Sequence, residues 1–292
     1  MIPGSRESVR RDRFRIDVAG GDVLRGDAWI PEAPRPDASI VVCHGFKGFK
    51  DWGFFPHLSE ALARRTGFLT ICFNFSGSGI GERPTEFDEL EAFGRNTFTR
   101  ELFDLEIVLD GLATGRLGEL SVLPSRRFGL LGHSRGGATC VLKAASRRAV
   151  RALVTWAGIA AVDRYVLAYA PAWEAGEEVS IVNARTGQRM PLYRNVLDDI
   201  RANRERLDVE ASARALSIPY LVVHGTADES VSPDDARTLA EAAGASATLL
   251  LIEEAGHTMN AGHPFQGPNP CLTRAIEASA DHFSAGLEGQ RA

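Results

Sequence analysis

The stretch Gly132-His133-Ser134-Arg135-Gly136 has the pattern G-x-S-x-G, in which a serine stands between two glycines. A short apolar run, Phe128 to Leu131, precedes it and is typical of a buried strand, whereas Gly137 to Ala145 has the composition of a helix. At such a strand-to-helix junction the glycines permit a close backbone approach that a Cβ would prevent. The pattern therefore predicts a strained turn that exposes the Ser134 hydroxyl as a nucleophile.

Two later stretches supply the partners that such a serine needs. Pro219 to Val223 is an apolar strand that runs into a turn ending at Asp228, and Ala247 to Ile252 is an apolar strand followed by a loop that contains His257. A serine hydroxyl becomes a nucleophile only when an adjacent base takes its proton and a third group orients that base. Because parallel sheets place active sites at their carboxyl ends, we expect Ser134, Asp228 and His257 to meet there.

Other histidines and acids compete for these roles. His263 lies six residues after His257, but it precedes a proline and does not follow a strand. Glu229 is adjacent to Asp228, and Asp234 and Asp235 lie at the start of the next predicted helix, where acids cap helices for structural reasons. The remaining histidines near strand ends are expected to bond to loops or to pack beside the sheet: His44, His133 and His224. No histidine pair has the i, i+4 spacing around a glutamate, so no metal site is expected.

The chain resembles the α/β-hydrolase family along nearly its whole length. Besides the serine turn, Val41 to Phe46 is similar to the family's His-Gly oxyanion loop, and Asn74 to Gly79 is similar to its glycine-rich turn after the fourth strand. His224-Gly225-x-x-Asp228 and Gly256-His257 are similar to its acid and base motifs. The resemblance is closest to the branch with cinnamoyl and feruloyl esterases, lysophospholipase-like esterases and serine peptidases related to prolyl oligopeptidase.

This resemblance implies a catalytic triad of Ser134, Asp228 and His257, and no cofactor. Attack by the serine creates an oxyanion that needs fixed N–H donors. The backbone N–H of Arg135 follows the nucleophile at a helix start, and the resemblance implies the N–H of Phe46 as the second donor.

Apolar runs separated by helices predict one α/β domain with a mostly parallel, eight-stranded sheet covered by helices on both faces. The first two strands are expected to form an antiparallel hairpin that turns at Gly20-Gly21-Asp22. The predicted strands are Phe14–Val18, Val23–Ile30, Ile40–Cys43, Leu69–Phe73, Phe128–Leu131, Ala152–Trp156, Tyr220–Val223 and Thr248–Ile252. The predicted helices are Phe54–Arg65, Thr97–Ala113, Ser134–Ser146, Pro233–Ala243 and Cys271–Gly286.

The connection between Trp156 and Ile218 is too long for one crossover helix. The resemblance implies a small cap there, so we expect residues 1–157 and 218–292 to form the core and residues 158–217 to form a cap or lid. The sequence predicts a hairpin in this segment, Ile181 to Leu192, turning at Thr186-Gly187. Its aromatic residues are equally suited to fixing the segment on the core and to touching substrate: Tyr165, Tyr169, Trp173 and Tyr193.

Several bulky or charged residues near the expected site could serve either substrate binding or the stability of the fold. Phe46 is expected to wall an acyl pocket, so the candidate substrate-binding residues are Phe46, Tyr165, Tyr169 and Trp173. Phe54 and Phe55 are expected in the core at a helix start. Arg135 is expected to pair with an acid of the cap or, alternatively, to bind a substrate carboxylate. Lys47 and Lys50 are expected to be solvated, although they could meet an acidic group.

Composition narrows the classes of function. Hydrophobic residues make up 44% and charged residues 24% of 292 residues, which is typical of a globular protein. A net charge of −5 argues against nucleic acid as a partner. No secretory signal or membrane span is expected, and the four cysteines are predicted to be buried free thiols: Cys43, Cys72, Cys140 and Cys271. A cytoplasmic protein, either a monomer or a homodimer, is expected.

The predicted function is hydrolysis of a small-molecule carboxylic ester through an acyl-enzyme on Ser134. Two alternatives remain open at this point. A serine peptidase or amidase would use the same three residues, and a non-catalytic small-molecule receptor can retain them on the same fold.

Overall fold

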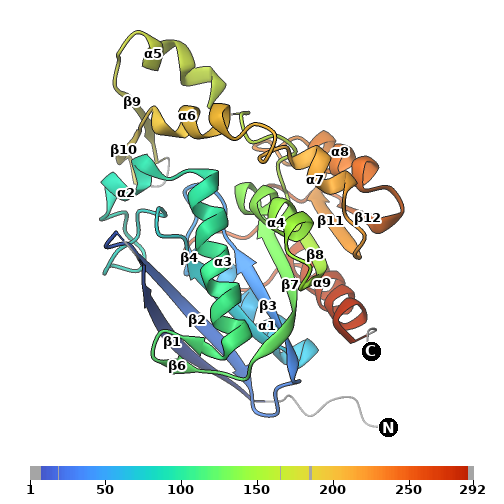
Figure 1. Cartoon of the computed structure of the whole chain (residues 1–292). Coiled ribbons are helices and arrows are strands. Elements are labelled where there is room, and N and C mark those ends of the chain that lie inside the picture. The colour runs from blue at the N-terminus through green and yellow to red at the C-terminus, as the bar shows by residue number, and fades with distance from the viewer. Residues whose placement is uncertain (1–7, 19, 165, 184–185, 289–292) are drawn as a thin grey trace.

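The computed structural model describes residues 8–18, 20–164, 166–183 and 186–288. Its centre is one eight-stranded sheet in the order β1-β2-β4-β3-β7-β8-β11-β12 (Figure 1). Only β2 runs opposite to the other strands, because it pairs antiparallel with both β1 and β4 while the later pairs are parallel. The strands of this sheet are β1 (Val9–Asp17), β2 (Val23–Pro31), β3 (Asp37–Cys43), β4 (Leu69–Asn74), β7 (Ser125–His133), β8 (Val150–Trp156), β11 (Tyr220–Gly225) and β12 (Ala247–Ile252).

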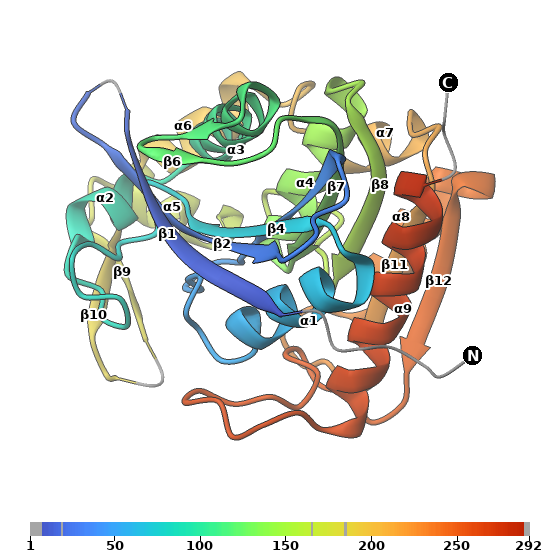
Figure 2. The same cartoon turned by 90° about the horizontal axis from the view of Figure 1, so that it is seen from below.

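Helices cover both faces of the sheet, and Figure 2 shows α1 and α9 on one side of the strands and α3 and α4 on the other. Each face has its own buried hydrophobic cluster. The helices of the two layers are α1 (Phe55–Thr66) and α9 (Pro270–Glu288) on one face, and α3 (Phe98–Thr114), α4 (Arg135–Ser146), α7 (Val209–Arg214) and α8 (Pro233–Ala243) on the other. This arrangement confirms the predicted fold class, including the eight strands and the leading hairpin.

Local sequence signals explain the helix ends. The Thr97 side chain accepts a hydrogen bond from the N–H of Arg100 at the start of α3, and Gly115 ends this helix with φ of 76°. Ser232 caps α8 in the same way, and Pro233 occupies the first turn, where no N–H is needed. Within the described ranges, no helix has the length and apolar composition to cross a lipid bilayer.

The described residues between 158 and 217, called the insertion below, form an irregular segment between β8 and β11 at the end of the sheet where β4 and β7 end (Figure 1). It includes η1 (Leu167–Tyr169), α5 (Ala170–Glu174), the hairpin β9 (Val179–Val182) and β10 (Arg189–Leu192), and α6 (Asn195–Ala202), and its last helix α7 packs against α4 and α8 in the core layer. The hairpin confirms its sequence prediction.

A short helix that the sequence did not predict, α2 (Leu90–Arg95), supports the insertion from the core side. The N–H of Tyr193 donates to the Gly94 carbonyl at 3.0 Å, and the Tyr193 hydroxyl donates to Glu91 Oε1 at 2.5 Å. Two further small elements, also unpredicted, lie at the edges: the β5 (Arg116–Leu117) and β6 (Leu120–Ser121) ribbon, and η2 (Gly244–Ser246).

Buried ion pairs tie the loop after β3 to the sheet. Lys50 Nζ lies 2.6 Å from Asp27 Oδ2 and 2.5 Å from Asp51 Oδ2, and Arg11 Nη2 lies within 2.8 Å of both carboxylates. The N–H of Lys50 donates to Asn74 Oδ1 at 2.7 Å. The expectation of a solvated Lys50 was wrong, because its side chain is only 9% exposed and faces an aspartate that is fully buried.

Replacing this lysine with methionine (Lys50→Met) leaves Asp27 buried with less compensating charge, so we expect the free energy of unfolding to fall by about 3 kcal/mol. Urea denaturation followed by circular dichroism measures this loss. Arg10 forms an exposed pair with Asp12 and is the control, since Arg10→Gln should cost less than about 1 kcal/mol. Equal losses in the two variants would show that the buried network does not stabilise the fold.

Candidate active site

Ser134 occupies the turn between β7 and α4 with φ of 57° and ψ of −120°, a conformation that side-chain-bearing residues rarely adopt. Its N–H donates to the Trp156 carbonyl at 2.9 Å, and its own carbonyl accepts from the N–H of Gly137 at 2.9 Å. These bonds hold Ser134 between β8 and the first turn of α4.

The glycines on either side of Ser134 are required by close backbone contact. A Cβ on Gly132 would lie 2.1 Å from the Gly136 carbonyl oxygen, and a Cβ on Gly136 would lie 2.4 Å from the His44 carbonyl oxygen. Both distances are far shorter than a real contact, so any side chain would push β3, β7 and α4 apart. The sequence prediction of a tight serine turn is confirmed.

Asp228 and His257, which follow β11 and β12, are joined by a hydrogen bond of 2.8 Å between His257 Nδ1 and Asp228 Oδ2. Asp228 is held from its other side, where Oδ1 accepts from the N–H groups of Ser230 at 2.8 Å and Val231 at 2.9 Å. His224 Nε2 also lies 3.2 Å from Asp228 Oδ2. The carboxylate thus has fixed donors around both oxygens.

These contacts set the charge of Asp228. Burial alone would raise the pKa of this carboxyl, but hydrogen bonds from His224, His257 and the N–H of Val231 outweigh burial and hold the pKa well below its usual range. Asp228 is therefore ionised and can accept the Nδ1 proton of His257. In that tautomer the Nε2 of His257 carries a lone pair that can take a proton.

The other histidines near the strand ends support loops, as predicted. His44 Nδ1 lies 2.9 Å from the Gly45 carbonyl while its Nε2 accepts from the N–H of Phe75 at 3.3 Å, and His224 Nε2 lies 3.0 Å from the Val231 carbonyl. His133 packs beside His257, with ring centroids 4.7 Å apart, and its Nε2 donates to the His257 carbonyl at 2.9 Å. His263 Nδ1 accepts from the N–H of Gly53 at 2.9 Å.

The loop after β3 comes directly against the serine turn. A Cβ built on Gly45 would lie 2.9 Å from the Ser134 Cβ, so only glycine fits beside the serine. The next residue is Phe46, whose N–H has no acceptor among the described residues. The N–H of Arg135 is in the first turn of α4, where helices leave N–H groups unpaired. Both N–H groups are thus free to bind an anionic oxygen.

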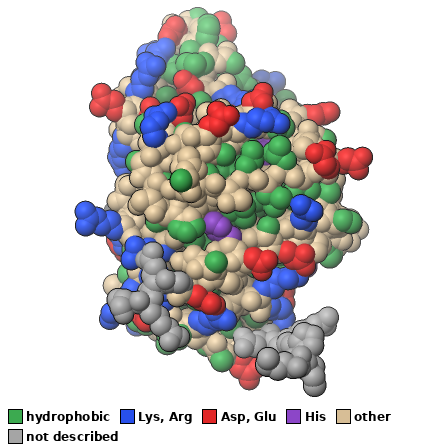
Figure 3. All heavy atoms as spheres, turned by 90° about the vertical axis from the view of Figure 1, so that its right-hand side faces the viewer, with side chains coloured by type: hydrophobic (Ala, Val, Ile, Leu, Met, Phe, Trp, Pro, Cys, Tyr) green, Lys and Arg blue, Asp and Glu red, His purple; other side chains and the backbone are tan. Residues whose placement is uncertain are grey.

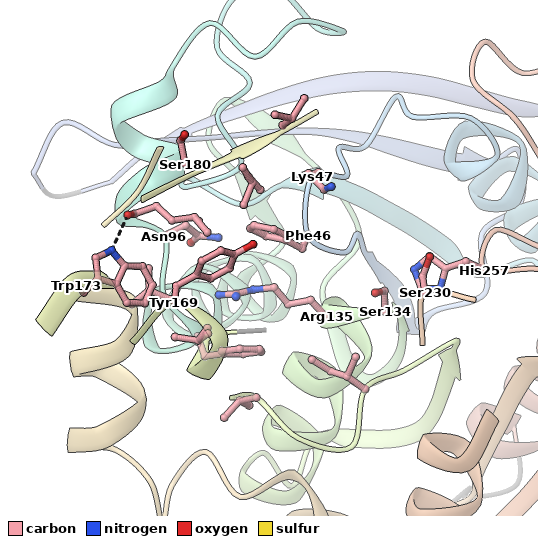
Figure 4. Close-up of a pocket in the computed structure, with 18 residues that line it drawn as sticks. Phe46, Lys47, Asn96, Ser134, Arg135, Tyr169, Trp173, Ser180, Ser230 and His257 are labelled. Carbon is pink, nitrogen blue, oxygen red and sulfur yellow. Dashed lines mark hydrogen bonds between the residues drawn. The ribbon is translucent and has the colours of Figure 1, made fainter. Parts of the chain in front are cut away.

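A cavity of about 720 Å³ connects these residues to the insertion. Ser134 and His257 line one end of it, and Tyr169 and Trp173 line the part beneath the insertion (Figure 4). Phe46 also lines the cavity, as predicted for a wall residue, and Tyr165 lies outside the described residues. Trp173 serves the insertion as well, because its Nε1 donates to the Leu192 carbonyl at 3.1 Å, and Tyr193 bonds to α2 instead.

Arg135 projects into this cavity but does not pair with an acid of the insertion. Its Nε donates to Glu101 Oε1 at 2.7 Å, and its guanidinium carbon lies 3.9 Å from the centre of the Phe98 ring. Glu101 is in the first turn of α3, in the core, and is almost fully buried. The expected partner was wrong, because α3 packs on α4 and brings Glu101 to Arg135 before the insertion can.

Sequence reasoning did not find the cavity residues that the insertion and the start of α3 contribute. They are mostly apolar and are spread over four segments: Asn96, Phe98, Ile159, Val166, Ile181 and Val196. No motif marks them, and only the length of the insertion indicated that some residues there would cover the site. Among the described residues, no cluster of histidine, cysteine or acidic side chains could hold a metal ion. Cys43, Cys72 and Cys140 are buried free thiols, as predicted, whereas Cys271, which was predicted to be buried too, is only half-buried.

Comparisons with known proteins agree with this arrangement. A sequence model described as "Alpha/beta hydrolase family" matches residues 40–267. A comparison with curated proteins gave no significant match.

Solved structures share the fold at low sequence identity. Est1E from Butyrivibrio proteoclasticus has a TM-score of 0.65 and 19% identity, covering 94% of this chain and 98% of Est1E; a second Est1E structure, at 18% identity, holds ferulic acid. A putative hydrolase from Agrobacterium vitis S4 has a TM-score of 0.68 and 20% identity, covering 96% of this chain and 100% of its own. The esterase domain of a Rhodothermus marinus protein has a TM-score of 0.60 and 19% identity, covering 95% and 97%.

The packing of His133 predicts a pH-dependent stability. Burial and the nearby His257 lower the pKa of His133 to about 3, so the folded protein keeps this ring neutral where the unfolded chain protonates it. Below the ordinary histidine pKa of about 6.5 the unfolded state binds one proton more, and the resulting loss of stability grows until the pH reaches about 3.

We expect the wild type to lose about 3 kcal/mol more than His133→Gln when the pH falls from about 7 to about 4.5. Urea denaturation at the two pH values gives both differences. A variant that loses as much stability as the wild type would show that His133 is not the group responsible.

Proposed function

The chain belongs to the α/β-hydrolase family, and from this membership we propose that it is a serine hydrolase that cleaves carboxylic esters of small molecules. The observation that carries the proposal is the hydrogen bond of 2.8 Å between Asp228 and His257 at the cavity end that Ser134 also lines. A buried, ionised carboxylate paired with a histidine beside a strained serine is the arrangement that activates a hydroxyl for attack.

In the proposed mechanism His257 Nε2 takes the proton of the Ser134 hydroxyl as its oxygen attacks the ester carbonyl. The tetrahedral intermediate collapses to an acyl-enzyme when His257 returns this proton to the leaving alcohol. Water, deprotonated by the same nitrogen, then attacks the acyl group and releases the acid and the free serine. Asp228 stays ionised throughout, fixes the tautomer of His257 and stabilises the imidazolium.

The oxyanion of each tetrahedral intermediate would be bound by the N–H groups of Phe46 and Arg135. The contact of Gly45 with Ser134 supports this assignment, because it places the loop after β3 directly beside the reacting hydroxyl. The dipole of α4, which begins at Arg135, adds positive potential at the same point. Loss of one such donor typically costs about 3 kcal/mol of transition-state stabilisation.

We propose that residues 158–217 act as a cap that completes the substrate pocket, with Phe46, Tyr169 and Trp173 contacting the substrate. Their support is the cavity between the insertion and Ser134, which is large enough for a molecule of the size of an aromatic ester. A structure of Est1E, a protein of similar fold, holds ferulic acid, and this supports a small ligand of the same class for the cavity. An amidase on the same residues remains the alternative, because the first chemical step is identical.

The first test is hydrolysis of p-nitrophenyl esters with acyl chains of about two to twelve carbons, by the wild type and by Ser134→Ala. We expect turnover by the wild type and a loss of at least about 10⁴-fold in kcat in the variant, since the residual rate comes from the oxyanion hole and binding alone. A matched p-nitroanilide series separates an esterase from an amidase. Absence of turnover together with no covalent adduct of Ser134 with a phosphonate probe would indicate a receptor.

A second test separates the two competing histidines. His257→Gln should lower kcat by at least about 10³-fold, because His257 is the histidine among the described residues that line the cavity with Ser134. His263→Gln is the matched control: this ring stacks on Trp52 and accepts from Gly53, so the variant should keep most of the esterase activity. The rates of ester hydrolysis by the two variants show which histidine acts as the base, and a larger loss of activity in His263→Gln would assign that role to His263.

A further inference from the structure

The cavity has a positive lining that ester hydrolysis itself does not require. Two of its described lining residues are cations, Lys47 and Arg135, and none of the described lining residues is acidic. The chain as a whole has a net charge of −5, so the lining does not follow from the overall composition. The face at the right-hand side of Figure 1 carries charges of both signs mixed together (Figure 3).

Arg135 is held in a way that leaves part of its guanidinium available. Glu101 is the anchor, and it accepts from Arg135 Nε at 2.7 Å, from Asn96 Nδ2 at 2.8 Å and from Thr139 Oγ1 at 2.8 Å. The guanidinium lies over the Phe98 ring. Its Nη2 is buried and has no hydrogen-bond partner among the described residues. A buried N–H group without an acceptor is unfavourable, so an acceptor on a bound ligand would relieve it.

Lys47 differs from its neighbour Lys50 in the same loop. Lys50 is buried and paired with two aspartates, whereas Lys47 is exposed, lines the cavity and forms no ion pair with any described residue. Lys47 directly follows Phe46, and in the view of Figure 4 the Phe46 ring lies between Lys47 and Arg135. The Arg135 guanidinium carbon is 6.0 Å from the centre of this ring. In this view the two cations therefore lie on opposite sides of the Phe46 ring, and both line the cavity.

We propose that the natural substrate carries a carboxylate, as in the monoester of a dicarboxylic acid, and that Lys47 and Arg135 select it. The inference rests on the proposed function, since it names the substrate class for that site. The Arg135 side chain starts beside the proposed nucleophile and extends along the cavity toward Tyr169 (Figure 4), so a carboxylate that meets its guanidinium must be joined to the acyl carbon through a spacer. Lys47 supplies the uncompensated charge, because Arg135 is already balanced by Glu101.

A binding measurement tests the proposal without turnover. Isothermal titration calorimetry of Ser134→Ala with glutarate and with its neutral diamide should give an affinity at least about tenfold higher for the dianion. Adding Lys47→Met should reduce the glutarate affinity about tenfold. Arg126 lies at the opposite end of β7 and is exposed, so Arg126→Gln removes one positive charge as a control and should have no effect on the affinity.

The second arm compares kcat/KM for mono-p-nitrophenyl glutarate with kcat/KM for p-nitrophenyl valerate. The ratio of the two should fall about tenfold in Lys47→Met, and also in Arg135→Lys, which keeps a charge for Glu101 but lacks the planar fork. A ratio that does not change in either variant, with equal binding of glutarate and the diamide, would overturn the proposal and leave the esterase function standing. Failure of all ester turnover would refute that function, and glutarate binding would still decide the charge preference.

Discussion

The backbone conformation of Ser134 is the constraint on which the rest of the site depends. Its φ of 57° is unfavourable for a residue with a side chain, typically by about 1–3 kcal/mol, and it persists because the surrounding strands allow no alternative. The Trp156 carbonyl on β8 and the N–H of Gly137 on α4 fix the peptide groups on both sides. Glycine at 132 and 136 lets these elements approach to contact distance. The hydroxyl is thereby held at the carboxyl end of the sheet, where the loops after β3, β11 and β12 also converge.

Most of this end of the molecule could be predicted from the sequence because its signals are local. The G-x-S-x-G pattern needs only its own strand and helix to have meaning. Asp228 and His257 each follow an apolar run, and because β11 and β12 are neighbours in the sheet, their carboxyl ends bring the two side chains together. The same reasoning ranked His263 below His257, and in the structure His263 Nδ1 accepts from the N–H of Gly53, whereas His257 Nδ1 lies 2.8 Å from Asp228 Oδ2.

The partner of Arg135, the burial of Lys50 and helix α2 could not be predicted, because each depends on how segments distant in the sequence pack together. The helix containing Glu101 was predicted, but which acid meets Arg135 depends on the packing of α3 on α4, and periodicity carries no information on that. Lys50 looked like an ordinary loop lysine, although it is buried against Asp27 on β2. Likewise α2 has no strong helical pattern of its own and is stabilised by its contact with Tyr193 of the insertion.

The pair of Arg135 and Glu101 is easier to explain by its position than by its contribution to folding. Removing two charges from water is costly, and a buried ion pair often stabilises a fold no better than apolar residues of similar volume. Glu101 nevertheless accepts from Asn96 and Thr139 as well as from Arg135, and the first two bonds fix the carboxylate that holds the Arg135 guanidinium at the wall of the cavity. Arg135 directly follows Ser134, so its backbone N–H lies in the first turn of α4 while its side chain lines the cavity. Under the proposed function, a carboxylate on α3 would therefore hold the substrate-recognising side chain on the same helix that begins at the proposed nucleophile.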